Sequence, residues 1–142
     1  HIKSAIEHAE LKKLLIDTSG IHSAEDFDNF HKEKAKLIMD NLMENKNVDR
    51  SKISYGRAAK IIAIYIKTAI IIPNNGDCEL SKIAHPPIDR ILLSNLSNQY
   101  PDETIFNTSW TKLNDRNYFE IIGKLRNIEP NQLWRIEKHW IL

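Results

Sequence analysis

The spacing of hydrophobic residues indicates helices along almost the whole chain. Apolar residues recur every three or four positions, and strict alternation of apolar and polar residues is almost absent. We expect an all-α fold, a single compact bundle-like domain of about six helices that spans residues 1–142. The expected helices cover about 2–17, 24–45, 54–72, 86–98, 115–128 and the stretch from 130 to the end.

Residues that favour helix starts mark several of these boundaries. Ser23, Ser54 and the pair Asn114–Asp115 precede amphipathic stretches and carry short polar side chains that can cap a helix. Pro86 and Pro87 precede another such stretch, and proline suits the first helical position. We therefore expect the fourth helix to begin at these prolines.

The most apolar stretch of the chain is "SYGRAAKIIAIYIKTAIII", residues 54–72. On a helix with 100° per residue, Arg57, Lys60, Lys67 and Thr68 fall within one arc of about 100°. Alanine, isoleucine and tyrosine dominate the rest of the circumference, and a helix of this kind is buried on nearly all sides. We expect 54–72 to be the buried central helix, with one narrow basic edge that faces solvent.

The charge balance of the whole chain argues against nucleic acid as the main partner. Lysine and arginine number 20 against 19 acidic residues, so the net charge is +1. Charge is nevertheless unevenly distributed, because residues 46–67 hold six cations and one acid while residues 22–45 hold six acids and three lysines. Either these neighbouring helices neutralise each other, or the basic edge receives an anionic ligand.

Cysteine content and hydropathy favour a cytoplasmic protein. The single cysteine, Cys78, excludes an internal disulfide and fits a reducing compartment. The charged N-terminal stretch does not have the form of a signal peptide. The longest apolar run, 61–72, is short for a membrane span and is interrupted by Lys67, so we expect no membrane association.

Two groups of residues are candidates for a site with the basic edge. Arg57 and Lys60 lie on that edge, and "AHPPIDRILL" brings His85, Asp89 and Arg90 within six positions. Asp89 would stabilise the first turn of a helix as a carboxylate at the positive end of its dipole. In a functional alternative, His85 transfers protons and Arg90 holds an anion. If both groups face one another, they form a phosphate-sized pocket.

A second candidate is the pair Arg135 and His139 in "RIEKH". On an α-helix these residues share a face, and the combination suits metal-independent RNA cleavage because histidine moves protons while arginine stabilises a charged phosphorane. The pair resembles the Arg–His motif of HEPN ribonucleases, although that motif separates the two by four to six residues. Here three residues intervene and Ile136 replaces the polar residue, so we do not assign the chain to that family. The alternative is the solvent-facing edge of a terminal helix.

Other chemistries find little support in the sequence. Asp28 and His31 lie one turn apart on an expected surface helix, but there is no HExxH motif or cysteine pair, and we expect no metal. No Walker loop, dinucleotide-binding glycine pattern or nucleophile elbow is present, and we expect no cofactor.

Two functional hypotheses follow. The first is a helical binding module, self-associating or bound to another protein or an anionic ligand through the Arg57/Lys60 edge and the 85–90 turn. The second is a metal-independent ribonuclease or phosphate-transfer enzyme that uses His85 or His139 with an arginine. Convergence of one histidine and two cations around an open pocket would favour the enzyme.

Overall fold

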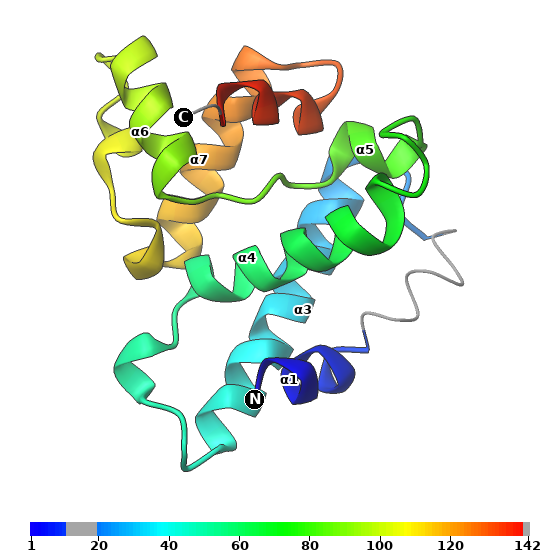
Figure 1. Ribbon diagram of the computed structural model, residues 1–142, viewed down its shortest axis with the longest axis vertical. Helices are drawn as coiled ribbons and strands as arrows, with labels where there is room; N and C mark the ends of the chain where they lie inside the picture. Colours follow the sequence, from blue (N-terminus) through cyan, green and yellow to red (C-terminus); the bar gives the residue numbers. More distant parts are fainter. Residues whose placement is uncertain (11–19, 141–142) are drawn as a thin grey trace.

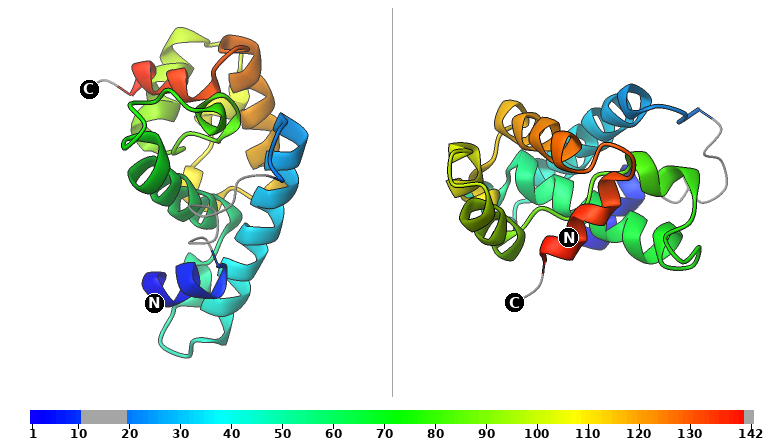
Figure 2. Two further views of the ribbon diagram at one scale, coloured as in Figure 1. Left: turned by 90° about the vertical axis from the view of Figure 1, so that its right-hand side faces the viewer. Right: turned by 90° about the horizontal axis from the view of Figure 1, so that it is seen from above.

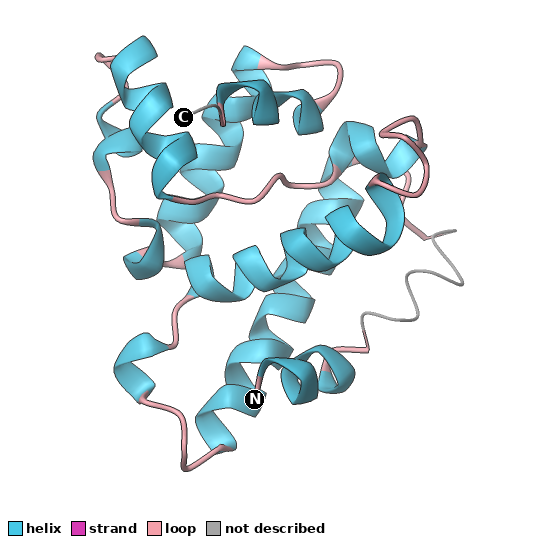
Figure 3. Cartoon of the chain, viewed as in Figure 1, coloured by secondary structure: helices cyan, strands magenta, loops and turns pink. Residues whose placement is uncertain are grey.

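The computed structural model describes residues 1–10 and 20–140, which form helices, turns and loops without a strand (Figure 1, Figure 3). The fold is all-α and forms one compact domain, as predicted. Its described α-helices are α1 (Ile2–His8), α3 (Ala24–Glu44), α4 (Tyr55–Ile66), α5 (Glu79–Ile83), α6 (Arg90–Gln99) and α7 (Asp115–Ile128). Shorter helical turns are η1 (Arg50–Lys52), η2 (Lys67–Ile71), η3 (Thr104–Asn107), η4 (Trp110–Lys112) and η5 (Leu133–His139).

Helix α4 crosses the middle of the molecule, with α1 on one side and α6, α7 and η5 on the other (Figure 1). It packs against α1, α3, α7 and η4 and continues into η2, a π-helical turn. The views in Figure 2 show the long helix α3 along one flank of the molecule. Buried side chains at Ala58, Ile62 and Ile66 face this core. The prediction of a central buried helix is therefore confirmed.

The solvent-facing edge of α4 differs from the prediction in one respect. Ile64 lies within the arc that holds Arg57 and Lys60, and 45% of its surface is exposed. The edge is thus not purely polar, because an open isoleucine lies among the cations. Ile61 beside it is half-buried.

Three predicted caps are confirmed by hydrogen bonds. The side chains of Ser23, Ser54 and Asn114 each accept a hydrogen bond from the backbone N–H three residues later, at 3.1, 3.2 and 2.8 Å. These bonds satisfy N–H groups that would otherwise lack a partner in the first turn. They fix the starts of α3, α4 and α7.

The predicted start of the fourth helix was wrong. Helix α6 begins at Arg90, and Asp89 is its N-cap, with its carboxylate accepting the Leu92 N–H at 3.0 Å. Pro86 and Pro87 belong instead to a buried, non-helical segment before the helix. An aspartate at the N-cap satisfies a free N–H, whereas a proline at the first position only avoids one.

The two ends of the chain also differ from the prediction. Helix α1 ends at His8, and residues 11–17, which we expected to be helical, lie outside the described residues. At the other end, the helix expected from Pro130 begins at Leu133 and is of the tighter 3-10 type. The short helix α5 was not predicted, because five residues are too few to show a helical period.

Gly56 allows the starts of α4 and α7 to meet. Its N–H donates to the Leu113 carbonyl at 3.1 Å, and a Cβ atom on this glycine would lie only 2.0 Å from the Trp110 carbonyl oxygen. No larger residue fits between these backbones. The contact places Ser54 and Asn114, the caps of two helices, at the same end of the molecule.

Within the described part of the chain, we find no helix with both the length and the apolar character needed to cross a membrane.

Candidate functional site

The structure does not bring the first group of predicted site residues into one pocket. His85 is buried in the core with 1% of its surface exposed, whereas Arg90 is exposed and lines a cavity beside α6. Arg57 and Lys60 line a different cavity, on α4. The two groups meet only where Lys60 Nζ lies 3.7 Å from Asp89 Oδ2.

Asp89 has a structural role in this arrangement. Its Oδ1 accepts the Leu92 N–H and also the Trp140 indole N–H, at 3.0 and 2.8 Å, and its Oδ2 faces Lys60. The carboxylate thereby links the start of α6 to α4 and to the end of η5. These contacts give the buried carboxylate a role in holding three elements together.

Arg57 and Lys60 border what we call the basic groove, a cavity of about 510 Å³ between α1, the end of α3, the connection 45–53 and α4. Its floor is apolar and includes the exposed Ile64. The groove is lined by His1, Ile2, Leu42, Asn47, Val48, Asp49, Lys52, Arg57, Lys60, Ile61, Ile64 and Trp110.

Trp110 organises the cations of the basic groove. Lys60 Nζ lies 4.4 Å from its ring centroid, and the guanidinium carbon of Arg57 lies 6.0 Å away. Arg57 Nε is buried without a hydrogen-bond partner in the described structure. Lys67, the third cation of the predicted edge, lies outside this groove and pairs with Glu137 at 2.7 Å.

A chain of polar side chains, which the sequence did not predict, runs through the core and ends at the partly exposed Asp28. It joins Tyr55, His31, Tyr118, His85 and Asp28, and we call it the buried polar chain. The successive distances are 2.8 Å from Tyr55 Oη to His31 Nδ1, 3.4 Å from His31 Nε2 to Tyr118 Oη, 2.9 Å from Tyr118 Oη to His85 Nδ1, and 2.8 Å from His85 Nε2 to Asp28 Oδ1.

Arg126 neutralises the Asp28 carboxylate, which lies at the outer end of the buried polar chain. Its guanidinium donates to both oxygens of Asp28, at 2.9 and 2.7 Å. Although burial raises the pKa of Asp28, the hydrogen bonds from His85 and Arg126 outweigh it and hold this pKa well below its ordinary value. Asp28 is therefore ionised and acts as a hydrogen-bond acceptor.

With an ionised Asp28, one arrangement of protons satisfies every link of the buried polar chain. Burial lowers the pKa of both His31 and His85, so both imidazoles are neutral. His85 donates from Nε2 to Asp28 and accepts from the Tyr118 hydroxyl at Nδ1. His31 then donates from Nε2 to Tyr118 and accepts from the Tyr55 hydroxyl at Nδ1. All donors point from Tyr55 towards Asp28.

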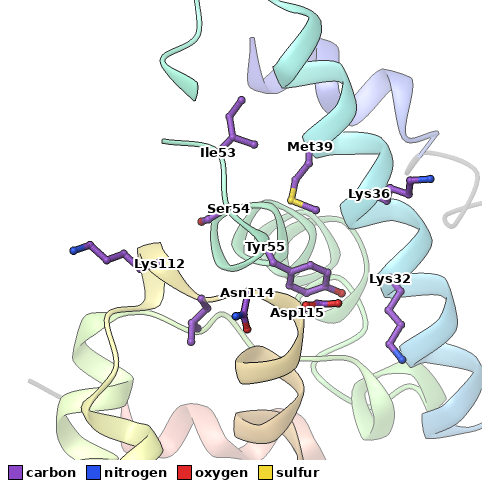
Figure 4. Close-up of a pocket in the computed structure, with 10 residues that line it drawn as sticks. Lys32, Lys36, Met39, Ile53, Ser54, Tyr55, Lys112, Asn114 and Asp115 are labelled. Carbon is purple, nitrogen blue, oxygen red and sulfur yellow. The ribbon is translucent and has the colours of Figure 1, made fainter. Parts of the chain in front are cut away.

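The Tyr55 end of this chain reaches a second cavity, which we call the lysine pocket. It has a volume of about 620 Å³ and lies between α3 and the starts of α4 and α7 (Figure 4). Burial and the Asp115 carboxylate raise the pKa of Tyr55, so its hydroxyl stays protonated. The pocket is lined by Lys32, Lys36, Met39, Ile53, Ser54, Tyr55, Lys112, Leu113, Asn114 and Asp115.

The second predicted pair, Arg135 and His139, does not share a helical face. Both residues lie in η5, and in a 3-10 helix positions four apart differ by about 120°. Arg135 is exposed, whereas His139 is half-buried and its Nε2 lacks a partner in the described structure. Burial and the nearby charge of Lys138 lower the pKa of His139.

His31 shows what the sequence analysis missed. We expected it on a surface helix, but it lies four positions after Phe27 and four before Ala35 on the buried face of α3. The spacing of these three positions is visible in the sequence, and it is the signal by which His31 could have been assigned to the buried face. Its partners Tyr55, Tyr118 and His85 come from distant positions, and no local pattern links them.

The described residues contain no cluster of three histidine, cysteine or acidic side chains that could hold a metal ion.

In comparisons with known proteins, no family model, no curated protein and no solved structure matches the chain.

Proposed function

We propose that the chain is a binding module that holds an apolar, acidic segment of a partner protein in the basic groove. The observation that carries this proposal is the exposed Ile64 on the floor of the groove, with Arg57 and Lys60 on the same edge of α4. An open apolar surface bordered by cations suits a segment that has leucine-like side chains flanked by carboxylates.

The charges of the groove favour an acidic partner. Three cations, Lys52, Arg57 and Lys60, line it against one acid, Asp49. The Asp49 carboxylate already accepts hydrogen bonds from the backbone N–H and the hydroxyl of Ser51, at 3.0 and 2.7 Å. A carboxylate of the partner can pair with the guanidinium of Arg57, which borders the groove.

Trp110 is the expected centre of binding energy. Tryptophan and arginine are among the residues that most often dominate protein interfaces, and here the side chains of Trp110 and Arg57 lie together in the lining of the groove. The groove also lies beside Ile2, whose side chain is exposed. Burial of these apolar surfaces supplies the affinity, and the cations supply the preference for acidic segments.

The experiment uses two fluorescent synthetic peptides of identical amphipathic pattern, one with glutamate and one with lysine at the polar positions. The glutamate peptide is expected to bind and the lysine peptide to bind at least tenfold more weakly. Ile64→Glu is expected to abolish binding, and Arg57→Glu to weaken it at least tenfold. The charge-matched control Arg135→Glu, on an exposed residue of η5, is expected to bind as the wild type does.

Two results would overturn this proposal. One is equal binding of both peptides, which would indicate a merely sticky surface. The other is a dimer in native mass spectrometry that Ile64→Glu dissociates while neither peptide binds, since the groove would then hold a second copy of the chain. Because the sequence predicts a homo-oligomer or a protein partner, native mass spectrometry of the wild type and of Ile64→Glu is part of the same experiment.

The enzymatic alternative receives less support from the described geometry. An enzyme of this kind requires a histidine and two cations around an open pocket. His31 and His85 are both buried, and His139 does not share a helical face with Arg135. We also propose that the protein acts in the cytoplasm, because a sequence with a single cysteine cannot form an internal disulfide and fits a reducing compartment.

A further inference from the structure

The exposed edge of α4 leads out of the basic groove to a second tryptophan, Trp140, at the end of η5. Ile64 lies four positions after Lys60 and three before Lys67, and residues at these spacings are neighbours on a helical surface. Lys67 Nζ in turn lies 5.3 Å from the centre of the Trp140 ring. The lysine that neighbours the open isoleucine of the groove therefore also contacts Trp140.

Asp89 provides a second link between the basic groove and Trp140. Its Oδ2 lies 3.7 Å from Nζ of Lys60, which lines the groove, and its Oδ1 accepts the Trp140 indole N–H at 2.8 Å. The two links start from different lysines of α4 and end at the same indole. Trp140 thus borders the same edge of α4 as the groove, although it does not line the cavity itself.

Trp140 is held in place although its ring is open to solvent. Its surface is 39% exposed, which makes it one of the exposed large apolar side chains of the described structure. The indole N–H, the one hydrogen-bonding group of this side chain, is already satisfied by the buried Asp89. An aromatic ring that is fixed before binding loses little conformational freedom when a partner covers it.

The two parts of this surface differ in charge. Three cations line the groove against one acid, so the groove favours carboxylates. At the other part, Lys67 already has a counterion within the protein, because its Nζ lies 2.7 Å from Glu137 Oε1. A carboxylate of a partner therefore gains little beside Lys67, whereas an uncharged apolar side chain can cover the Trp140 ring.

From these features we propose that the partner segment continues out of the basic groove, across the edge of α4, and places an uncharged apolar side chain on Trp140. This inference rests on the proposed function of the groove and adds an order to the partner: acidic residues at the groove, and an apolar residue beyond them. Helix α1 and η5 lie on opposite sides of α4 (Figure 1), so a segment that leaves the groove crosses this edge to reach Trp140. Tryptophan is among the residues that most often dominate such interfaces.

Fluorescence anisotropy with extended forms of the glutamate peptide tests this order. The peptide is lengthened at one terminus or at the other, and each extension ends in leucine, serine or glutamate. At one of the two termini, the leucine extension is expected to bind at least about fivefold more tightly than the serine extension. The glutamate extension is expected to bind no more tightly than serine, because Glu137 already neutralises Lys67.

Trp140→Ala is expected to remove the advantage of leucine over serine and to leave the affinity of the serine peptide within about twofold of the wild type. The unchanged serine peptide shows that the groove of the variant is intact. Met43→Ala is the matched control, because it removes an exposed apolar side chain of α3 that does not line the groove. This control is expected to keep the full advantage of leucine.

A second measurement uses the unaltered protein. The NMR signal of the Trp140 indole N–H is expected to shift with the leucine-extended peptide and not with the serine-extended peptide. The indole signal of Trp134, which is buried in the same helical turn η5, is expected to stay unchanged with both.

The inference is overturned, with the groove proposal intact, if leucine gives no advantage at either terminus while Ile64→Glu still abolishes binding of the serine peptide. It is also overturned if Trp140→Ala weakens the leucine and serine peptides equally, or if the Trp140 signal does not respond. Absence of binding by every peptide overturns both proposals together.

Discussion

His85 Nε2 lies 2.8 Å from Asp28 Oδ1, although 57 positions separate the two residues in the chain. Asp28 belongs to α3, His85 to the buried segment before α6, and Arg126, which grips the same carboxylate, to α7. One side chain thereby fixes three parts of the fold relative to one another.

Asp28→Asn is expected to lower the free energy of unfolding by about 2 kcal/mol. The variant removes the charge that Arg126 neutralises and leaves a guanidinium that is 29% exposed without its counterion. Urea denaturation followed by circular dichroism measures the change. The control Asp102→Asn, at an exposed position, is expected to change stability by less than about 0.5 kcal/mol. Equal effects of both variants would contradict the role of Asp28.

Stability is expected to fall as the pH is lowered below about 6.5, the ordinary pKa of histidine. Burial lowers the pKa of His31 and His85 in the folded protein, so the unfolded chain binds protons there that the folded chain does not. Each histidine then removes up to about 1.4 kcal/mol per pH unit until its folded pKa is reached. Asp28 adds a further loss below its ordinary pKa, since its folded pKa is lowered too.

Urea denaturation at a series of pH values measures this dependence, and nitrogen chemical shifts of the two imidazoles report their protonation. Both imidazoles are expected to take up a proton at a lower pH in the folded protein than in the unfolded chain. A stability that does not change between pH 7.5 and 5, or imidazoles that are protonated in the folded protein at the same pH as in the unfolded chain, would contradict this account.

Gly56→Ala is expected to destabilise the protein by about 3 kcal/mol. The added methyl group would lie 2.0 Å from the Trp110 carbonyl oxygen, and backbone atoms cannot move aside cheaply. Gly123→Ala is the matched control, because its Cβ meets nothing within 4 Å in the middle of α7, and it is expected to stabilise by about 0.5 kcal/mol or more. Thermal unfolding compares the two, and a tolerated Gly56→Ala would mean that the starts of α4 and α7 do not meet.

Lys67→Glu is expected to cost about 1 kcal/mol, and the exchange Lys67→Glu with Glu137→Lys to recover most of it. Lys67 Nζ lies 2.7 Å from Glu137 Oε1, and both side chains are about one-quarter exposed, so the coupling is modest. A double-mutant cycle measures the coupling energy. A value of zero would show that the pair contributes nothing, and that Lys67 merely extends into solvent.

The helices were predictable from the sequence because their signals are local. Apolar spacing identified the central helix around Ile62, and the side chains of Ser23, Ser54 and Asn114 marked three helix starts. The start of α6 was misplaced because Pro86 and Asp89 both favour a helix start, and the sequence does not show which of them prevails.

The candidate sites were less predictable because they depend on contacts between distant segments. Arg57 and Lys60 do lie together, since both belong to α4, but His85 turned inwards to Asp28 and Tyr118. The interior partners of a histidine are set by helix packing rather than by its neighbours in the chain. Arg135 and His139 were paired on the assumption of α-helical geometry, whereas η5 is a 3-10 helix.

The most direct test of the basic groove follows the isoleucine methyl groups by NMR while the glutamate peptide is added. Ile61 and Ile64 line the groove, whereas Ile121 and Ile122 are fully buried in α7. We predict that the methyl signals of Ile61 and Ile64 shift with increasing peptide and that those of Ile121 and Ile122 do not. Unchanged signals from Ile61 and Ile64 in the presence of bound peptide would contradict the account.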